Sequence, residues 1–201
     1  SRELIDNLDI INYPYDLEDD FGNKIIYYES SRGCPFNCSF CMSSIDKKMR
    51  VFSIERVKRD LKLLLGTNAK QIKFVDRTFN ADYKRSMEIM EFIVENNIHN
   101  MTIHFEITAD IINEEFLEFL SKIPVNMFQF EVGVQSLNLK TLNEINRHMD
   151  RSRLWNAINK IKGNQNIHLH LDLIAGLPYE DYEAFKKSFD GVYKLGAEKI
   201  Q

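Results

Sequence analysis

The sequence predicts an α/β fold in which a parallel sheet is built from alternating strands and helices. Six short runs are rich in β-branched and aromatic residues, as strands are, and the segments between them place apolar residues at helical spacing. Such alternation requires parallel strands joined by right-handed crossovers. An open doubly wound sheet and a (βα)n barrel both satisfy this pattern.

The first part of the chain shows the alternation twice. Residues 24–30 (KIIYYES) are β-branched and aromatic and predict the first strand. Ser53 is typical of a helix N-cap, and the helix after it would carry on one face Val57, Leu61, Leu64 and Leu65. Residues 71–75 (QIKFV) predict the second strand, and residues 82–96 have helical spacing through Met87, Met90, Ile93 and Val94.

The rest of the chain continues in the same way, since each further strand is a short β-rich run and each further helix an amphipathic stretch. In chain order these elements are the strand 101–107 (MTIHFEI), a helix capped by Asn113, the strand 127–134 (MFQFEVGV), helical stretches at 138–145 and 151–162, the strand 167–174 (IHLHLDLI), the helix 182–195 and a sixth strand that begins at 198 (EKIQ).

Length and composition predict one core domain. The chain has 201 residues, of which 44% are hydrophobic, enough for a substantial core at 24–201. Residues 1–23 are mixed and acidic and predict a lead-in or linker segment, and the initial Ser suggests a piece of a longer protein. The net charge of −4 gives no electrostatic footprint for a nucleic-acid partner. Because no apolar stretch approaches the roughly 20 residues of a membrane span and no secretory signal is visible, we expect a soluble cytoplasmic protein.

One loop contains all the cysteines and carries the strongest functional signal. Cys34, Cys38 and Cys41 lie in the segment RGCPFNCSFC with the spacing C-x3-C-x2-C. An odd, clustered set does not predict a disulfide framework and fits thiolates reserved for metal. A cubane cluster has four irons, and the chain has no fourth cysteine to ligate the last of them. The spacing therefore favours a [4Fe–4S] cluster with one iron open to a small-molecule ligand.

Two other readings of this loop remain open. A zinc ion could take its fourth ligand from one of the histidines, although structural zinc sites usually pair two separated knuckles. The candidates are His99, His104, His148, His168 and His170. His168 and His170 alternate in a strand, which favours ordinary sheet histidines. An electron-transfer cluster is the other reading, but such clusters normally have a fourth cysteine.

Polar residues lie where several predicted strands end. Glu106 ends the third strand, Gln135 follows the fourth and Asp172 lies late in the fifth, while Tyr28 precedes Cys34 by six residues. In parallel α/β folds, ligands gather at the carboxyl ends of the strands. A carboxylate near the end of a buried strand is costly unless it is paired or binds a ligand. These residues therefore predict a site beside the cysteine loop.

The cysteine loop closely resembles the CxxxCxxC signature of the radical S-adenosylmethionine (SAM) superfamily, including the aromatic Phe40 before the last cysteine. The resemblance implies that Cys34, Cys38 and Cys41 ligate a [4Fe–4S] cluster whose unique iron binds the amino and carboxylate groups of SAM. It implies reductive cleavage to methionine and a 5′-deoxyadenosyl radical, with flavodoxin or ferredoxin as the reductant. It also implies a partial (βα)6 TIM-type barrel, truncated at its sixth strand, acting on an unknown substrate.

Further segments resemble oxygen-independent coproporphyrinogen dehydrogenases and their relatives. These segments are GVQS at 133–136 with Arg147 and His148 beyond it, and DLIAGLP at 172–178. By that likeness Tyr28 and Glu106 would contact SAM, Phe40 would pack near its adenine, and the SAM or substrate side of the pocket would be lined by Gln135, Arg147 and Asp172. Arg147 could otherwise be an exposed cation at a helix end.

Two positions depart from that pattern. Ser43 stands where the coproporphyrinogen enzymes have a further cysteine, and DRTFN at 76–80 replaces their Gly-rich turn. The DRTFN segment instead resembles SAM-binding barrels that follow a cobalamin domain, and methylthiotransferases, and it adds Asp76 to the predicted cofactor-binding residues. Radical methylation would follow if a cobalamin domain lies upstream. A methylthiotransferase is the alternative, and it would need a second cluster domain and an RNA-binding module.

Overall fold

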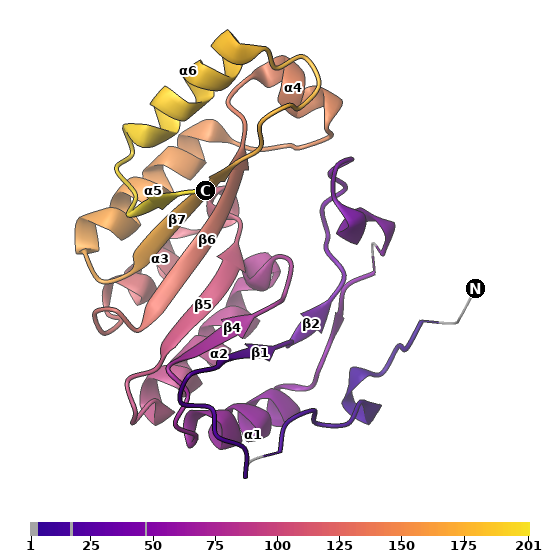
Figure 1. Cartoon of the computed structure of the whole chain (residues 1–201), viewed down its shortest axis with the longest axis vertical. Coiled ribbons are helices and arrows are strands. Elements are labelled where there is room, and N and C mark those ends of the chain that lie inside the picture. The colour runs from indigo at the N-terminus through magenta and orange to yellow at the C-terminus, as the bar shows by residue number, and fades with distance from the viewer. Residues whose placement is uncertain (1–3, 17, 47) are drawn as a thin grey trace.

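The computed structural model describes residues 4–16, 18–46 and 48–201. Six parallel strands form one sheet in the order β1-β4-β5-β6-β7-β8, so β1 and β8 are its edges. These strands are β1 (Ile25–Tyr28), β4 (Gln71–Phe74), β5 (Thr102–Ile107), β6 (Phe128–Gln135), β7 (His168–Leu173) and β8 (Lys199–Ile200). The predicted α/β class and all six predicted strands are confirmed, and the curved sheet is a partial barrel (Figure 1).

Helices connect the strands along the outer side of the sheet, from α1 at the bottom of the view to α6 at the top (Figure 1). They are α1 (Ile54–Leu65), α2 (Tyr83–Asn96), α3 (Glu114–Ser121), α4 (Leu139–Glu144), α5 (Arg151–Asn164) and α6 (Tyr182–Tyr193). The predicted N-caps are confirmed, since Ser53 Oγ accepts from Arg56 N and Asn113 Oδ1 accepts from Phe116 N. The shorter 3₁₀ helices are η1 (Leu8–Ile10), η2 (Met42–Ile45), η3 (Phe79–Ala81) and η4 (Ala109–Ile111). Among the described residues, no helix combines the length and apolarity that crossing a bilayer demands.

The two faces of the sheet differ sharply in chemistry. The face toward the helices is apolar and buried, with side chains such as Ile26, Ile72, Phe74, Ile103, Phe105, Phe128, Phe130, Leu169 and Leu171. The opposite, inner face is polar in successive rows fixed by the strand register. One row is Tyr27, Lys73, His104, Gln129 and His168, and the next is Glu106, Glu131, His170 and Lys199. Closed barrels fill this space with branched apolar side chains, so a polar inner face is suited to a ligand.

The segment before the first strand packs against the sheet and α1. Leu8 and Phe21 belong to the hydrophobic core. Asp9 Oδ1 accepts a hydrogen bond from Ser53 N (2.9 Å), and Phe21 N donates to Asn68 Oδ1 (2.9 Å). The predicted lead-in is therefore held at Leu8, Asp9 and Phe21 by both apolar and polar contacts.

The cysteine loop connects the two strands of a small ribbon that was not predicted from the sequence. The first strand leaves the main sheet after Tyr28, and β2 (Ser31–Arg32) then pairs antiparallel with β3 (Arg50–Val51). Each of these strands has two residues, too few for a periodic pattern. The ribbon carries the cysteine loop away from the sheet edge as an arm (Figure 1).

The aromatic core behind β5 gives a direct test of the packing. Phe105 is fully buried, and its ring lies 4.2 Å from Phe79 and 4.7 Å from Phe74 between centroids. We expect Phe105→Ala to lower the free energy of unfolding by about 3–5 kcal/mol because it opens a cavity. Urea unfolding followed by circular dichroism measures this. Tyr193→Ala, at a side chain that is 68% exposed, should change it by less than about 0.5 kcal/mol, and equal losses in both variants would contradict the assignment of the core.

Candidate functional site

A cavity of about 160 Å³ lies between the cysteine loop and the carboxyl ends of the strands. The loop contributes Cys34, Phe36, Cys38, Phe40, Cys41 and Ser44. The strands and the segments that follow them contribute Arg77, Thr78, Glu106, Ile107, Thr108, Glu131, Gly133, Gln135, Arg147 and Asp172. The fold thus brings together the three cysteines and five of the seven other predicted site residues, namely Phe40, Glu106, Gln135, Arg147 and Asp172.

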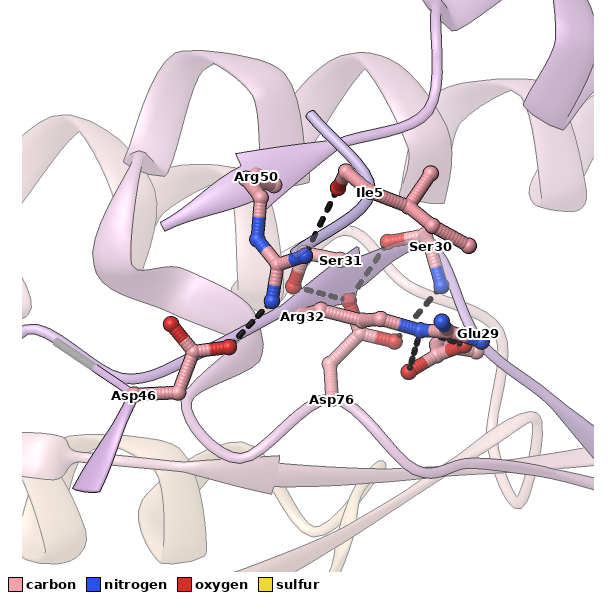
Figure 2. Close-up of polar contacts among 8 residues, drawn as sticks. All are labelled: Ile5, Glu29, Ser30, Ser31, Arg32, Asp46, Arg50 and Asp76. Carbon is pink, nitrogen blue, oxygen red and sulfur yellow. Dashed lines mark hydrogen bonds and ion pairs between the residues drawn. The ribbon is translucent and has the colours of Figure 1, made fainter. Parts of the chain in front are cut away.

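Asp76 does not line the cavity. It fixes the first stem of the cysteine loop, which is the segment that leads from β1 into the loop (Figure 2). Its side chain is 1% exposed and accepts hydrogen bonds from Ser30 N (2.9 Å), Ser30 Oγ (2.7 Å) and Ser31 Oγ (2.5 Å). Burial raises the pKa of Asp76, and these hydrogen bonds oppose the rise. Ser30 and Ser31 lie just before Cys34, so the carboxylate sets where the loop begins. The predicted contact of Asp76 with a cofactor stays a prediction.

The second stem, which is the segment that leads out of the cysteine loop, is held by Arg50 (Figure 2). Its guanidinium pairs with Asp46 and donates to Ile5 O (2.7 Å). The two stems approach so closely at Gly33 that a Cβ there would lie 2.5 Å from Lys48 O, and the φ of Gly33 is +89°. Only glycine fits both the conformation and the space.

Two segments from other parts of the chain hold the cysteine region itself. Thr78 Oγ1, from the segment after β4, lies 3.4 Å from Cys34 Sγ. The turn after α4 contacts the middle of the loop, where Ile145 O accepts from Ser39 N (2.9 Å) and Asn146 Nδ2 donates to Asn37 O (2.8 Å). These contacts hold the loop from two places, the segment after β4 and the turn after α4.

Arg147 connects the same turn to a cysteine sulfur. Its Nη1 lies 3.8 Å from Cys38 Sγ, and its Nη2 donates to Gly133 O (2.6 Å). The guanidinium carbon lies 6.0 Å from the centre of the Phe36 ring. Arg147 is therefore part of the cavity wall, and the alternative of an exposed helix-end cation is wrong.

Three carboxylates face the other side of the cavity. Glu106 and Glu131 are directly opposite each other in the register of β5 and β6. His104 Nε2 (3.0 Å) and Lys73 Nζ (3.3 Å) contact Glu131 Oε2. The hydrogen bond from His104, helped by the charge of Lys73, lowers the pKa of Glu131 to about 2, so this carboxylate is ionised throughout the physiological range.

The other two carboxyl groups hold their protons more tightly. Burial and the charge of Glu131 raise the pKa of Glu106. Burial, followed by repulsion from Glu131 and Glu106, raises the pKa of Asp172 to about 7. Asp172 Oδ1 is buried with no hydrogen-bond partner among the described residues. An excess of acceptors of this kind is suited to a ligand that carries positive charge or N–H donors.

Tyr28, like Asp76, lies behind the cavity. Its side chain is 5% exposed and points to the helix side, where its ring packs against Phe74 (centroids 5.3 Å apart) and its hydroxyl donates to Asp60 (3.4 Å). Burial and the neighbouring Asp60 charge raise the pKa of the Tyr28 hydroxyl. Its predicted contact with SAM stays a prediction.

Several residues of the cavity were not predicted from the sequence. Arg77 and Thr78 follow β4, and only the fold places them at the cavity, where Thr78 contacts Cys34. Glu131 could have been found, because polar residues at 129, 131 and 135 occupy alternate positions along β6 and mark its inner face.

The donor set fits an iron–sulfur cluster. Three thiols line one cavity, and soft thiolate ligands are those that iron–sulfur clusters prefer. Within the described ranges, no three His, Cys, Asp or Glu side chains gather closely enough to hold a single metal ion. None of the five histidines thus completes a preformed single-ion site with the cysteines there.

Curated relatives share this chain but extend well beyond it. An uncharacterized methyltransferase of Pyrococcus horikoshii is 29% identical over 209 residues, covering 100% of this chain and 45% of the relative. The ribosomal protein uS12 methylthiotransferase RimO of Petrotoga mobilis is 25% identical over 183 residues, with 87% and 41% covered. The chain therefore spans less than half the length of these relatives.

Solved structures share the fold. The radical SAM methyltransferase TsrM from Kitasatospora setae, with cobalamin and a [4Fe–4S] cluster bound, has a TM-score of 0.75 at 15% identity and covers 88% of this chain and 33% of its own. Coproporphyrinogen III oxidase (HemN) from Escherichia coli, a radical SAM enzyme, has a TM-score of 0.63 at 18% identity, with 92% and 45% covered.

The sequence model of the radical SAM superfamily matches residues 28–191, which include the cysteine loop, every strand of the sheet except part of β1 and the short β8, and the whole cavity wall. Because that match covers most of the chain, this protein belongs to the radical SAM superfamily, whose members use a [4Fe–4S] cluster and SAM.

Proposed function

We propose that the chain is the SAM-cleaving core of a radical SAM enzyme, with the cluster on Cys34, Cys38 and Cys41. The observation that carries the proposal is the shared cavity, in which the three thiols face the carboxyl ends of β5, β6 and β7. A [4Fe–4S] cluster bound there would deliver the electron for reductive cleavage of SAM to methionine and a 5′-deoxyadenosyl radical. The three thiolates would ligate three irons and leave the fourth open.

The cavity wall offers complementary groups for SAM. SAM carries a sulfonium, an ammonium and a carboxylate, and Glu106 and Asp172 would attract its positive groups. Arg147 and Gln135 face the same space with donors for its anionic and neutral oxygens. Phe40 is 40% exposed at the cavity and offers a ring face to the adenine. Tyr28 and Asp76 would act from behind, by fixing the strand end and the loop.

Radical methylation with cobalamin is the full-length activity that we favour. The relative that matches the whole chain at 29% identity is named a methyltransferase, and TsrM is a radical SAM methyltransferase solved with cobalamin bound. Cobalamin would then sit on a domain outside this chain. The test is to purify the full-length protein anaerobically with added cobalamin, since a protein without cobalamin absorbance would remove this candidate.

A methylthiotransferase is the second candidate, favoured by the similarity to RimO and to tRNA-2-methylthio-N(6)-dimethylallyladenosine synthases. All three cysteines of this chain lie in one loop, so the ligands of any second cluster would have to come from another part of the protein. About eight irons per full-length chain instead of about four would support it.

The chemistry of the site favours a reducing environment with an external electron donor. The three cysteines are free thiols, which a reducing compartment such as the cytoplasm maintains. A flavodoxin or ferredoxin would supply the electron, because the cluster needs a low-potential one-electron donor.

Anaerobic reconstitution with iron and sulfide tests the cluster. We expect about four irons per chain and an electron paramagnetic resonance signal that shifts when SAM is added. Cys38→Ala should abolish the cluster while the circular dichroism spectrum is retained, because it removes one ligand of three. Ser39→Ala, at an exposed neighbour whose contact is through its backbone N–H, is the matched control. One zinc per chain without a cluster, or full iron binding by Cys38→Ala, would overturn the assignment.

The titration of Asp172 gives a second test, on the cluster-free chain. Its pKa of about 7 lies above the ordinary value of 3.8, so from about pH 4 to 7 the folded state keeps a proton that the unfolded state has released. The ionisation of Asp172 therefore destabilises the folded chain as the pH rises through that window. The charges that set it are Glu131 and Glu106, opposed by Lys73 and Lys199.

Asp172→Asn removes this penalty, so its gain in Tm over the wild type should be larger at pH 8 than at pH 5. Thermal unfolding at the two pH values measures the difference. Asp190→Asn, at an exposed position on α6, should show no such pH-dependent gain. A gain for Asp172→Asn that is the same at both pH values would mean that Asp172 is not held protonated.

A further inference from the structure

We propose that Arg147 is a positioning residue that holds Cys38 and raises the reduction potential of the cluster. This inference rests on the proposed function, because it concerns the cluster that the three cysteines would hold. It assigns Arg147 a task toward the cluster itself, separate from any contact with SAM.

The guanidinium of Arg147 bridges the cysteine loop and the sheet. The guanidinium reaches two groups from distant parts of the chain, with Nη1 3.8 Å from Cys38 Sγ and Nη2 2.6 Å from Gly133 O. The planar fork of an arginine can span a sulfur and a carbonyl in this way, whereas a lysine ammonium acts as a point charge. Cys38 is thereby tied to the end of β6, on the far side of the cavity from its own ribbon.

The backbone around Arg147 is fixed for this contact. Arg147 N donates to Leu142 O (2.9 Å). Asn146 has a left-handed φ of +53° and donates its side-chain N–H to Asn37 O (2.8 Å). Asparagine tolerates the left-handed conformation better than most residues, but the conformation still costs free energy. It is therefore typical of a turn that its surroundings constrain. The turn and the cysteine loop are thus joined on both sides of the Arg147–Cys38 contact.

The contact between Arg147 and Cys38 is largely buried. Cys38 is 6% exposed, and Arg147 Nε is buried without a hydrogen-bond partner among the described residues. Partial burial lowers the effective dielectric, so the charge acts on its neighbours more strongly than an exposed cation would.

The electrostatic consequence concerns the one-electron reduction. The electron comes from a low-potential donor, which is oxidised as the cluster gains one negative charge. A cation with an N–H donor at a ligating sulfur stabilises the more negative, reduced form, and hydrogen bonds to the sulfurs are known determinants of cluster potential. The carboxylates of Glu106 and Glu131 line the same cavity and act in the opposite direction. Arg147 therefore offsets a negative wall that would otherwise make reduction harder.

The test measures the potential of the reconstituted cluster with SAM absent, using dithionite and redox mediators and following the reduced cluster by electron paramagnetic resonance. We expect Arg147→Gln to lower the reduced-to-oxidised ratio at a fixed potential about tenfold, which corresponds to about 59 mV for a one-electron couple. Arg147→Lys keeps the charge and loses the fork, so its potential should fall between those of the wild type and Arg147→Gln. Arg77→Gln is the matched control, because Arg77 lines the same cavity but is exposed and screened by solvent.

The outcomes separate this inference from the proposed function. A wild-type chain that forms no cluster removes the proposed function. A cluster with the same potential in the wild type, Arg147→Gln and Arg147→Lys overturns the inference alone, even if SAM binding is weakened. An equal fall in Arg77→Gln and Arg147→Gln would also overturn it, because any cavity charge would then suffice. If Arg147→Gln cannot hold the cluster, Arg147→Lys decides, since an unchanged potential there contradicts the role of the fork.

Discussion

The buried carboxylate of Asp76 is the contact on which the geometry of the site depends. It holds Ser30 and Ser31 at the point where the chain leaves the sheet for the cysteine loop. Burying a carboxylate costs free energy, which its three hydrogen bonds offset only in part, as the raised pKa of Asp76 indicates. Arg85 adds a cation nearby and donates to Ser30 O (3.3 Å). This buried contact costs free energy, and it fixes the position from which the loop with the three thiols begins.

The two faces of the sheet have different roles, one in stability and the other in function. The helix side supplies the apolar burial that stabilises the domain, whereas the inner side places like charges opposite each other at Glu106 and Glu131. Directly opposed like charges destabilise a sheet. His104 and Lys73 relieve the repulsion by pairing with Glu131, which leaves Glu106 and Asp172 with raised pKa values at the cavity. The inner face is thus arranged for a ligand at the expense of sheet stability.

Local patterns were sufficient to predict most of the fold. The six strands follow from short β-branched and aromatic runs, and the caps at Ser53 and Asn113 follow from side-chain chemistry that acts within one turn. The common site of Glu106, Gln135 and Asp172 follows from the rule that parallel strands present their carboxyl ends at one edge. Both kinds of inference need only neighbouring residues or the order of elements.

The parts that the sequence did not reveal depend on contacts between distant residues or on strand orientation. Asn37 and Asn146 are 109 positions apart, and no local pattern indicates that a turn after α4 meets the cysteine loop. Tyr28 differs, because alternation along β1 puts it on the same face as the buried Ile26 and puts Tyr27 on the inner face.

Charge is unevenly distributed around the cavity, and this follows from which elements supply it. The carboxylates come from the strands β5, β6 and β7, whereas Arg147 comes from the turn that contacts the cysteine loop. A ligand with both signs of charge is oriented by such a field before any close contact forms. Since the strands are fixed by the core and the turn by its bonds to the loop, the direction of that field is set by the fold. The loop that carries the thiols and the strands that carry the carboxylates are held in place separately, and Arg147 contacts both, at Cys38 Sγ and at Gly133 O.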